Sequence, residues 1–319
     1  MRFTEEQLER FASPISQTED QKCKNAIGMV RDAMKKLDYT DDDKEIRTYL
    51  ADTFSYALDL RQKYTNRKIT LFVQGSYANK TNIPSESDVD VAVILESTFI
   101  GNYRSGFSAD NYNFSSSTDT VSSLKDDVEK ALKQHFNYSG VERCDKSIKV
   151  VGNTYRVDAD VVPAYRYRDY SRDFSFNESN FVGGIEIRPD SGGRIINYPE
   201  QHIMSDNAKN KNTKYNFKKC VRIIKNMREI MEENGYIIST NISSFGLESL
   251  LWNVDVSEYI RYPNTLKLTL DEVIIFLKNN TSNYYEYMEA NGIKMLFTDD
   301  LTKNSYITFV NDLSYFYEY

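Results

Sequence analysis

The sequence predicts an α+β protein with a sheet lobe and a helical lobe. Three observations support this prediction. Apolar residues recur at helical spacing near the N-terminus, strand-like runs separated by glycine-containing turns fill the middle, and helical patterns return from about residue 205 onward. A chain of 319 residues is long enough to bury a core in each lobe. We expect residues 1–200 to form the sheet lobe with its N-terminal helices and residues 201–319 to form the helical lobe.

Helix-start patterns precede the first periodic segments. Capping-box patterns begin at residues 4 and 16, and a similar pattern at residue 40 predicts a helix that runs toward residue 63. Residues 68–74 then form an apolar strand that ends at Gly75, and residues 88–95 place alternate apolar side chains on one face. We expect a loop over 101–120, a helix over 121–136, a hairpin with strands over 146–151 and 154–162, and an irregular polar segment over 166–199.

The last third of the chain has helical periodicity. An apolar stripe from Phe217 to Met231 predicts one long helix with a buried face. Further helices are expected over 243–252, 270–279 and 302–316, with Thr269 as the cap of the second of them.

Composition excludes several classes of protein. Hydrophobic residues make up 40% and charged residues 27% of the chain, which is typical of a folded globular protein. The net charge of −7 disfavours a protein whose main task is non-specific nucleic-acid binding. The longest apolar runs, such as 91–95 and 273–277, are too short to cross a membrane. We therefore expect no membrane association and a cytoplasmic location.

Cysteines and histidines are few, which limits metal and redox chemistry. Three cysteines, odd in number and far apart, are expected to be reduced cytosolic thiols. Two histidines are too few for a zinc cluster of the usual Cys/His spacing. A carboxylate site for a hard divalent cation is still allowed.

Two short motifs bring chemistry to neighbouring strands. Gln74-Gly75-Ser76-Tyr77 ends one strand, and Ser87-Asp88-Val89-Asp90 begins the next. Side chains at i and i+2 of a strand point to the same face, so Asp88 and Asp90 lie together. Two carboxylates this close repel each other unless a cation lies between them, and oxygen-only ligands suit Mg²⁺ or Mn²⁺. The glycine-serine turn offers backbone N–H groups and a hydroxyl to phosphate oxygens.

A later strand carries a third candidate ligand. Asp158 and Asp160 share one face of a segment that ends at Pro163. If this strand pairs near the strand of Asp88, Asp160 completes a three-carboxylate site for two metal ions, and Asp158 is the weaker candidate. The alternative is that these aspartates line solvent-exposed strand faces. The glycine-serine turn at its offset from Asp88 favours the metal site.

With these motifs together, the chain resembles the polymerase β-type nucleotidyltransferase superfamily. Segments 157–164, 197–202, 218–225 and 243–253 make it similar to the bacterial CD-NTase (cGAS/DncV-like nucleotidyltransferase) family, whose relatives include cyclic GMP-AMP synthase and 2′-5′ oligoadenylate synthetase. The resemblance covers roughly residues 15–255. It implies a polymerase β-like catalytic lobe, a helical nucleotide-binding lobe like that of poly(A) polymerases and oligoadenylate synthetases, and an active site in the cleft between them.

The same resemblance implies a function. It would be an enzyme of bacterial antiviral (CBASS) signalling that makes a cyclic di- or trinucleotide from NTPs, at least one of them ATP or another purine NTP. Two Mg²⁺ or Mn²⁺ ions would be its cofactors, and a separate effector would respond to the product. Two alternatives stay open. One is a template-independent nucleotidyltransferase with a linear product, such as an oligoadenylate or an RNA tail, and the other is a catalytically inactive nucleotide- or RNA-binding module.

The resemblance also assigns roles to individual positions. The catalytic metal ligands would be Asp88, Asp90 and Asp160, and the nucleotide-binding residues would be Gly75, Ser76, Lys225, Ser244 and Phe245. In this assignment Lys225 and Ser244 grip the triphosphate and Phe245 stacks on a base. The alternatives are a snorkelling surface lysine at 225 and a core aromatic at 245.

One segment is strongly basic although the chain is acidic. The window Lys209–Arg228 holds eight basic residues and no acidic one. It is either a solvated helix that also serves the nucleotides or, in part, a surface that binds an activating polyanion such as RNA. The zinc insert of the family's vertebrate branch has no counterpart here, so zinc-dependent DNA sensing is not expected.

Overall fold

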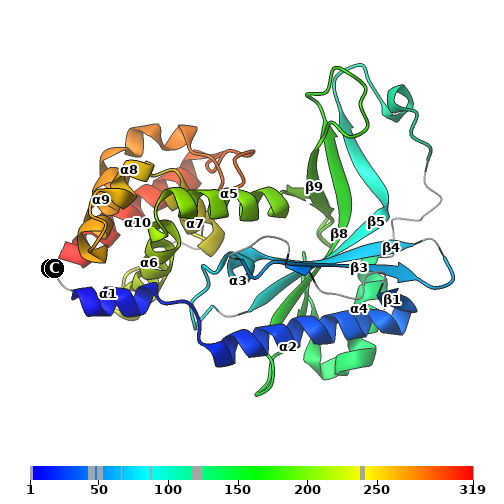
Figure 1. Cartoon of the computed structure of the whole chain (residues 1–319), viewed down its shortest axis with the longest axis horizontal. Helices are drawn as coiled ribbons and strands as arrows, with labels where there is room; N and C mark the ends of the chain where they lie inside the picture. Colours follow the sequence, from blue (N-terminus) through cyan, green and yellow to red (C-terminus); the bar gives the residue numbers. More distant parts are fainter. Residues whose placement is uncertain are drawn as a thin grey trace. The chain divides into compact units, whose positions relative to one another are not determined.

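The computed structural model describes residues 3–41, 47–48, 53–65, 67–86, 88–116, 124–237 and 241–318. The chain divides into two compact units, each discontinuous in sequence (Figure 1). The sheet unit comprises Gln17–Ala78 and Ser87–Glu200, and the helical unit comprises Met1–Ser16, Asn79–Glu86 and Gln201–Tyr319. The α+β fold class is confirmed. The units differ from the expected division at residue 200, because the N-terminal segment and residues 79–86 belong with the C-terminal helices.

The sheet unit is built on a ten-stranded mixed sheet. Along its main path the strand order is β1-β3-β4-β5-β8-β7-β6, while β2 pairs with β3 and β9 pairs with both β8 and β10. β5 and β8 run parallel, and the other described pairs are antiparallel. The strands are β1 (Tyr39–Asp41), β2 (Arg47–Thr48), β3 (Tyr56–Gln62), β4 (Lys68–Gln74), β5 (Val89–Tyr103), β6 (Val141–Arg143), β7 (Ile148–Val150), β8 (Ala159–Tyr170), β9 (Val182–Ile187) and β10 (Ile195–Asn197).

The apolar residues of the central strands explain this arrangement. Every residue from Val91 to Leu95 in β5 is fully buried. Continuous apolar runs of this kind are typical of strands covered on both faces. The helices α2 (Gln17–Met34) and α4 (Leu124–Phe136) pack on one face of the sheet (Figure 1). Shorter helical segments of the unit are η1 (Lys35–Leu37), α3 (Gly75–Asn79), η2 (Ala109–Tyr112) and η4 (Tyr138–Gly140).

Strand β5 is irregular at its middle. Its register with β8 shifts between Leu95 and Phe99, and the second half pairs with residues 166–170. Aromatic side chains cover this second half: the rings of Tyr103 and Tyr170 stack with centroids 5.6 Å apart. The first half of β5 therefore carries the Asp-x-Asp motif against the apolar core, while the second half serves a separate aromatic cluster.

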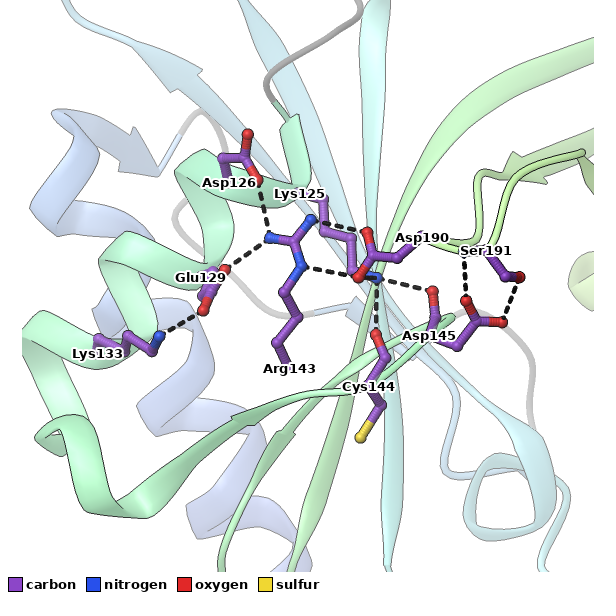
Figure 2. Close-up of polar contacts among 9 residues, drawn as sticks. All are labelled: Lys125, Asp126, Glu129, Lys133, Arg143, Cys144, Asp145, Asp190 and Ser191. Atoms are coloured by element: carbon purple, nitrogen blue, oxygen red, sulfur yellow. Dashed lines mark hydrogen bonds and ion pairs between the residues drawn. The ribbon is translucent and has the colours of Figure 1, made fainter.

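A polar cluster fastens the outer part of the sheet to α4 (Figure 2). Arg143 in β6 donates to both carboxylate oxygens of Asp190 at 2.8 Å, and to Asp126 and Glu129 of α4 at 2.8 and 2.6 Å. Lys125 of α4 donates to Asp190 at 2.8 Å. These bonds hold the loop after β9 against α4, although a single exposed pair contributes only about 0–1 kcal/mol.

The helical unit packs its helices around one apolar core. The predicted stripe of the long helix is confirmed, since its residues are all buried: Phe217, Cys220, Val221, Ile224, Met227 and Met231. The helices are α1 (Glu5–Ala12), α5 (Pro199–Asn212), α6 (Asn216–Glu233), α7 (Ser244–Trp252), α8 (Val256–Ile260), α9 (Leu266–Asn279), η5 (Thr281–Glu286) and α10 (Asp300–Glu318). No described helix is long and apolar enough to cross a bilayer.

The N-terminal helix is joined to this core by hydrogen bonds at its first turn. The capping box at Thr4 is confirmed, with Gln7 N–H donating to Thr4 Oγ1 at 3.2 Å and Thr4 N–H donating to Gln7 Oε1 at 2.9 Å. Glu5 caps a second helix, because its carboxylate accepts from the backbone N–H groups of Leu266 and Lys267 at the start of α9. Carboxylates at helix N-termini satisfy unpaired N–H groups and the helix dipole.

The expected helix from residue 40 toward residue 63 is wrong. The structure has β1, β2 and β3 there, and the expected capping residue Thr40 lies in β1, while residues 42–46 and 49–52 lie outside the described residues. The physical reason is that Leu58 and Leu60 alternate inward when β3 pairs with β4. That pairing buries them on the sheet, which a helix with the same residues would not achieve.

Three other boundaries differ from expectation. The 101–120 loop begins only after Tyr103 and contains η2, the strand expected from 154 begins at Ala159, and the irregular 166–199 segment contains the end of β8 together with β9 and β10. The helix expected over 121–136 starts at Leu124 within the described residues, as 121–123 lie outside them. The helix expected over 270–279 starts earlier, at Leu266, with Thr265 as its cap.

The buried half of β5 gives a stability prediction. Leu95→Ala removes a fully buried side chain and should lower the free energy of unfolding by about 3 kcal/mol, through lost apolar burial and the cavity left behind. Val151→Ala is a control in the same unit, because Val151 is exposed and its truncation should change the value by less than about 0.5 kcal/mol. Urea denaturation followed by circular dichroism measures both, and equal effects would contradict the assigned core.

Candidate functional site

Strand pairing brings the three predicted carboxylates together in the sheet unit. Asp88 directly precedes β5, and Asp90 is its second residue. In the parallel pairing of β5 with β8, Asp90 is in register with Asp160. Asp90 is also in register with Gln74 at the end of β4. The sequence-based expectation that Asp160 lies beside the Asp88 strand is therefore met by the register itself.

The turn after β4 is shaped around one of these carboxylates. Gly75 has φ +73°, a left-handed conformation that favours glycine. A Cβ at this position would lie 2.0 Å from Asp90 Oδ2, so any side chain there would displace the carboxylate. Ser76 follows in α3, which Tyr77 anchors by donating a hydrogen bond to Asp20 of α2 at 2.8 Å. The glycine-serine turn is thus fixed directly against Asp90.

The electrostatic surroundings of Asp160 disfavour its ionised form. Burial and the nearby Asp88 raise the pKa of Asp160, while Lys149 acts in the opposite direction. Lys149 itself is bound to Asp158, with Lys149 Nζ 2.8 Å from Asp158 Oδ2. A cation that approached Asp88 and Asp160 would relieve the repulsion between their carboxylates.

Asp158 has a different role from Asp160. Besides the ion pair with Lys149, its carboxylate accepts the backbone N–H of Gly152 at 2.6 Å. These two bonds close the turn between β7 and β8, and they lower the pKa of Asp158, the contact with Lys149 being the larger cause. The sequence ranked Asp158 as the weaker ligand candidate, and its partners explain why it stabilises the turn.

The residues present fit hard divalent cations. The donor set near Asp90 consists of carboxylate oxygens, which Mg²⁺ and Mn²⁺ prefer. Because Gly75 has no side chain, the Asp90 carboxylate can lie directly against the turn. Partly buried, mutually repelling carboxylates in a fixed register are what a site for such ions requires.

The remaining candidates lie in the helical unit. Lys225 is fully buried in α6, which contradicts the alternative of a snorkelling surface lysine. Ser244 is the first residue of α7, and the preceding Ser243 caps the helix by accepting from Gly246 N–H at 2.9 Å. Phe245 is 38% exposed, so it is not the core aromatic of the alternative reading. Its ring meets the edge of the His202 ring, with centroids 5.0 Å apart.

Sequence reasoning missed two residues that contact these candidates. The carboxylate of Glu86 accepts from Ser244 Oγ at 2.6–2.7 Å and lies 3.4 Å from Lys225 Nζ. Arg228 is bound to Glu86 and to Ser244 Oγ. Arg228 could have been found from the sequence, since it follows Lys225 by three positions on one helix face. Glu86 gives no such signal, because it is distant from α6 in sequence.

A buried charged network lies close by in the same unit. His202 Nε2 is 3.0 Å from Glu248 Oε1 and 3.2 Å from Asp206 Oδ2. Glu248 also accepts from Asn79 and Thr81, at 3.2 and 2.8 Å. Burial alone would lower the pKa of His202, but Asp206 and Glu248 outweigh it and raise that pKa to about 10. The network fastens residues 79–81 to α5 and α7.

His202, Asp206 and Glu248 are close enough to share a metal ion, but their geometry favours hydrogen bonding. The imidazole nitrogen nearest the carboxylates is within hydrogen-bond distance of both, as an N–H donor would be. Asn79 and Thr81 already donate to Glu248. The contacts of this group therefore connect α5, α7 and residues 79–81 within the helical unit.

The predicted basic face is smaller than the sequence indicates. Of the eight basic residues between 209 and 228, four are buried, namely Lys218, Arg222, Lys225 and Arg228. Arg222, for example, donates to the carbonyl oxygens of Ala12 and Lys80. Only Lys211 and Lys214 of the eight are fully exposed. Most of the charge in this window thus serves contacts inside the helical unit.

Two successive segments of the chain match known protein families. Residues 56–182 match a family described as a nucleotidyltransferase domain. Residues 205–318 match a family described as the cGAS/DncV-like nucleotidyltransferase C-terminal helical domain. The first range contains the three carboxylates, and the second contains Lys225, Ser244 and Phe245.

Individual relatives extend the similarity over the whole chain. Cyclic GMP-AMP synthase CdnE03 of Staphylococcus schleiferi is 41% identical, over 100% of this chain and 98% of the relative. The solved Rhodothermus marinus CdnE c-UMP-AMP synthase with Apcpp and Upnpp has a TM-score of 0.78 and 29% identity, covering 98% of this chain and 97% of that one. The Elizabethkingia meningoseptica CdnE cyclic dinucleotide synthase with GTP and Apcpp has a TM-score of 0.74 and 29% identity, covering 100% of both.

The buried network predicts a pH-dependent stability. A histidine whose pKa rises on folding stabilises the fold fully below its unfolded value, and this contribution disappears as pH rises through about 10. His202→Gln should therefore cost about 3 kcal/mol or more at pH 6, as loss of a buried ionic partner does, and progressively less toward pH 10. Denaturant unfolding at several pH values measures the difference from the unmodified chain.

The chain provides a matched control in its second histidine. Burial lowers the pKa of His135, so His135→Gln should give a difference that does not shrink between pH 7 and 10. A cost for His202→Gln that is independent of pH would show that His202 is neutral in the folded protein.

Proposed function

Because the chain belongs to the cGAS/DncV-like nucleotidyltransferase family, we propose that its three sheet-unit carboxylates catalyse the joining of NTPs into a cyclic oligonucleotide. The enzyme is a nucleotidyltransferase, and the relatives named above are cyclic nucleotide synthases. A role in bacterial antiviral signalling is consistent with this family. The observation that carries the site assignment is the register of Asp90 with Asp160, beside Gly75.

The proposed site residues act mainly by positioning and charge. Asp88, Asp90 and Asp160 would hold two Mg²⁺ or Mn²⁺ ions. The family implies the use of divalent metal ions. When bound, such ions lower the pKa of an attacking ribose hydroxyl and neutralise charge on the pyrophosphate leaving group. The glycine-serine turn offers backbone N–H groups and the Ser76 hydroxyl to the triphosphate.

The reaction consists of two displacements of the same kind. A ribose hydroxyl oxygen forms a bond to the α-phosphorus of the donor NTP, and the bond from that phosphorus to pyrophosphate breaks. Asp160 is proposed to orient the attacking hydroxyl or to accept its proton. A second attack, within the linear intermediate, closes the ring and releases a second pyrophosphate.

In the helical unit, Lys225 and Ser244 are proposed to bind triphosphate oxygens. Both are fixed by their surroundings, Lys225 by complete burial and Ser244 by its position at the start of α7. Phe245 is proposed to contact a base, which its partial exposure allows. These assignments come from the family resemblance, and the burial and cap geometry support them.

Substrates and partners form the finer part of the proposal. NTPs, at least one of them ATP or another purine NTP, are the proposed substrates, and a separate cyclic-nucleotide-responsive effector in the cytoplasm is the proposed recipient. The two solved relatives named above hold Apcpp and Upnpp in one case and GTP and Apcpp in the other. Binding of an activating RNA stays a prediction. Four of the eight basic residues in the proposed surface are buried, so fewer of them can contact RNA.

Replacing the carboxylates tests the site. Asp88→Asn, Asp90→Asn and Asp160→Asn should each reduce pyrophosphate release by about 100-fold or more, since loss of several kcal/mol of transition-state stabilisation costs tenfold in rate for every 1.4 kcal/mol or so. EDTA should abolish turnover of the unmodified enzyme. A coupled pyrophosphate assay with mixed NTPs and Mg²⁺ or Mn²⁺ measures these rates.

Asp158→Asn is the matched control, because it removes the same charge two residues from Asp160, at a position that closes a turn. It should retain most of the activity. Equal losses for Asp158→Asn and Asp160→Asn, or turnover that survives Asp90→Asn, would refute the assignment.

Product analysis separates the proposal from a linear synthase. Purified enzyme with each NTP alone and in combination should yield a phosphatase-resistant product, because ring closure leaves no terminal phosphate. Liquid chromatography with mass spectrometry identifies its bases and ring size, and parallel reactions with added RNA report on activation. Products that phosphatase trims would favour the linear alternative, and an absence of any product with all NTPs would favour the inactive module.

A further inference from the structure

The anion-binding groups of the helical unit already surround an anion from the chain itself. Ser244 Oγ lies 2.7 and 2.6 Å from the two carboxylate oxygens of Glu86. Lys225 Nζ is 3.4 Å from Glu86 Oε2, and Arg228 is bound to Oε1. Arg228 also donates to Ser244 Oγ at 3.0 Å, so the three groups form one continuous subsite.

The two cationic side chains of this subsite are more deeply buried than the carboxylate that they bind. The side chain of Lys225 is 0% exposed and that of Arg228 is 10% exposed, whereas that of Glu86 is 24% exposed. Two buried cations thus face a single carboxylate, which enters from the more exposed side.

A carboxylate in this setting has the chemistry of a phosphate oxygen pair. Guanidinium, ammonium and hydroxyl donors bind carboxylates and phosphates with the same geometry. One carboxylate supplies a single negative charge, whereas a polyphosphate supplies several charges and more acceptor oxygens. Glu86 therefore satisfies the subsite only partly, and a polyphosphate would satisfy it better.

The segment that carries Glu86 is attached to the helical unit by contacts other than those of the Glu86 side chain. Glu86 closes a short turn, with its N–H donating to the carbonyl oxygen of Ile83 at 3.0 Å. It stands at the end of the segment Asn79–Glu86, just before Asp88. Asn79 and Thr81 hold the start of this segment to Glu248, so its attachment does not depend on the Glu86 side chain.

We propose that Glu86 is an internal competitor that occupies the anion subsite of Lys225, Arg228 and Ser244 until the polyphosphate of an NTP displaces it. The proposal rests on the proposed function for the identity of the displacing ligand. It adds Arg228 to the polyphosphate-binding groups, and it gives Glu86 the role of weakening NTP binding. A carboxylate that served the fold alone would stabilise the protein without opposing the ligand.

The test compares stability with polyphosphate affinity. Glu86→Gln keeps the side-chain shape but removes the competing charge, so calorimetric titration with inorganic tripolyphosphate should show affinity about tenfold higher, equivalent to about 1.4 kcal/mol. The melting temperature of the free variant should fall, because two buried cations lose their partner. These opposite changes are the signature of a competitor. Unchanged or weaker tripolyphosphate binding would overturn the proposal.

Two further variants complete the design. Glu229→Gln is the matched control, since Glu229 lies next to Arg228 on α6 but is bound to Ser85, so tripolyphosphate affinity should not change. If Glu86→Gln does not fold, Glu86→Asp withdraws the charge by one methylene and should bind tripolyphosphate more tightly than the unmodified chain, and failure to do so counts against the proposal.

Because tripolyphosphate binding needs no catalysis, the outcomes remain separable from the proposed function. Tighter binding by Glu86→Gln together with turnover that survives Asp90→Asn would support the competitor and refute the catalytic site. The reverse pair of results would refute the competitor alone.

Discussion

The parallel pairing of β5 with β8 is the constraint on which the chemistry of the sheet unit depends. It fixes Asp90 opposite Asp160 and sets Asp88 close enough to influence Asp160. Side chains on adjacent strands lie within a few ångströms when they are in register, so like charges there must be compensated. A shift of the register by one residue would turn Asp160 to the other face and replace it with an apolar neighbour. The buried run from Val91 to Leu95 opposes such a shift, because it would expose the core.

Local motifs explain why the proximity of Gly75, Asp90 and Asp160 could be predicted from the sequence. The strand that ends at Gln74, the turn at Gly75 and the Asp-x-Asp start of the next strand are contiguous or nearly so, and strand periodicity places their side chains. The long helix α6 was equally predictable from its apolar stripe. Its basic residues were less so, because spacing alone does not reveal which of them are buried against partners.

The errors arose where pairing partners far away in sequence decide the structure. We expected residues 166–199 to be irregular, but Gly183 and Gly184 in this segment lie in β9. A Cβ at Gly184 would lie 2.8 Å from the carbonyl oxygen of Asn197, so this glycine permits the close approach of β9 and β10. Glu86 was missed for the same reason, because its partners Arg228 and Ser244 are 142 and 158 residues away in the sequence.

The two units carry charge clusters of opposite sign, acidic in the sheet unit and basic in the helical unit. In the sheet unit, Asp88 and Asp160 raise the free energy of each other's ionised state, which favours a bound cation. In the helical unit, Lys225 and Arg228 are buried and need an anion, a requirement that Glu86 meets with one charge. A polyphosphate carries several negative charges and would meet this requirement more fully. Binding such a ligand therefore exchanges one internal ion pair for several stronger ones, and the net affinity depends on how strongly Glu86 is held.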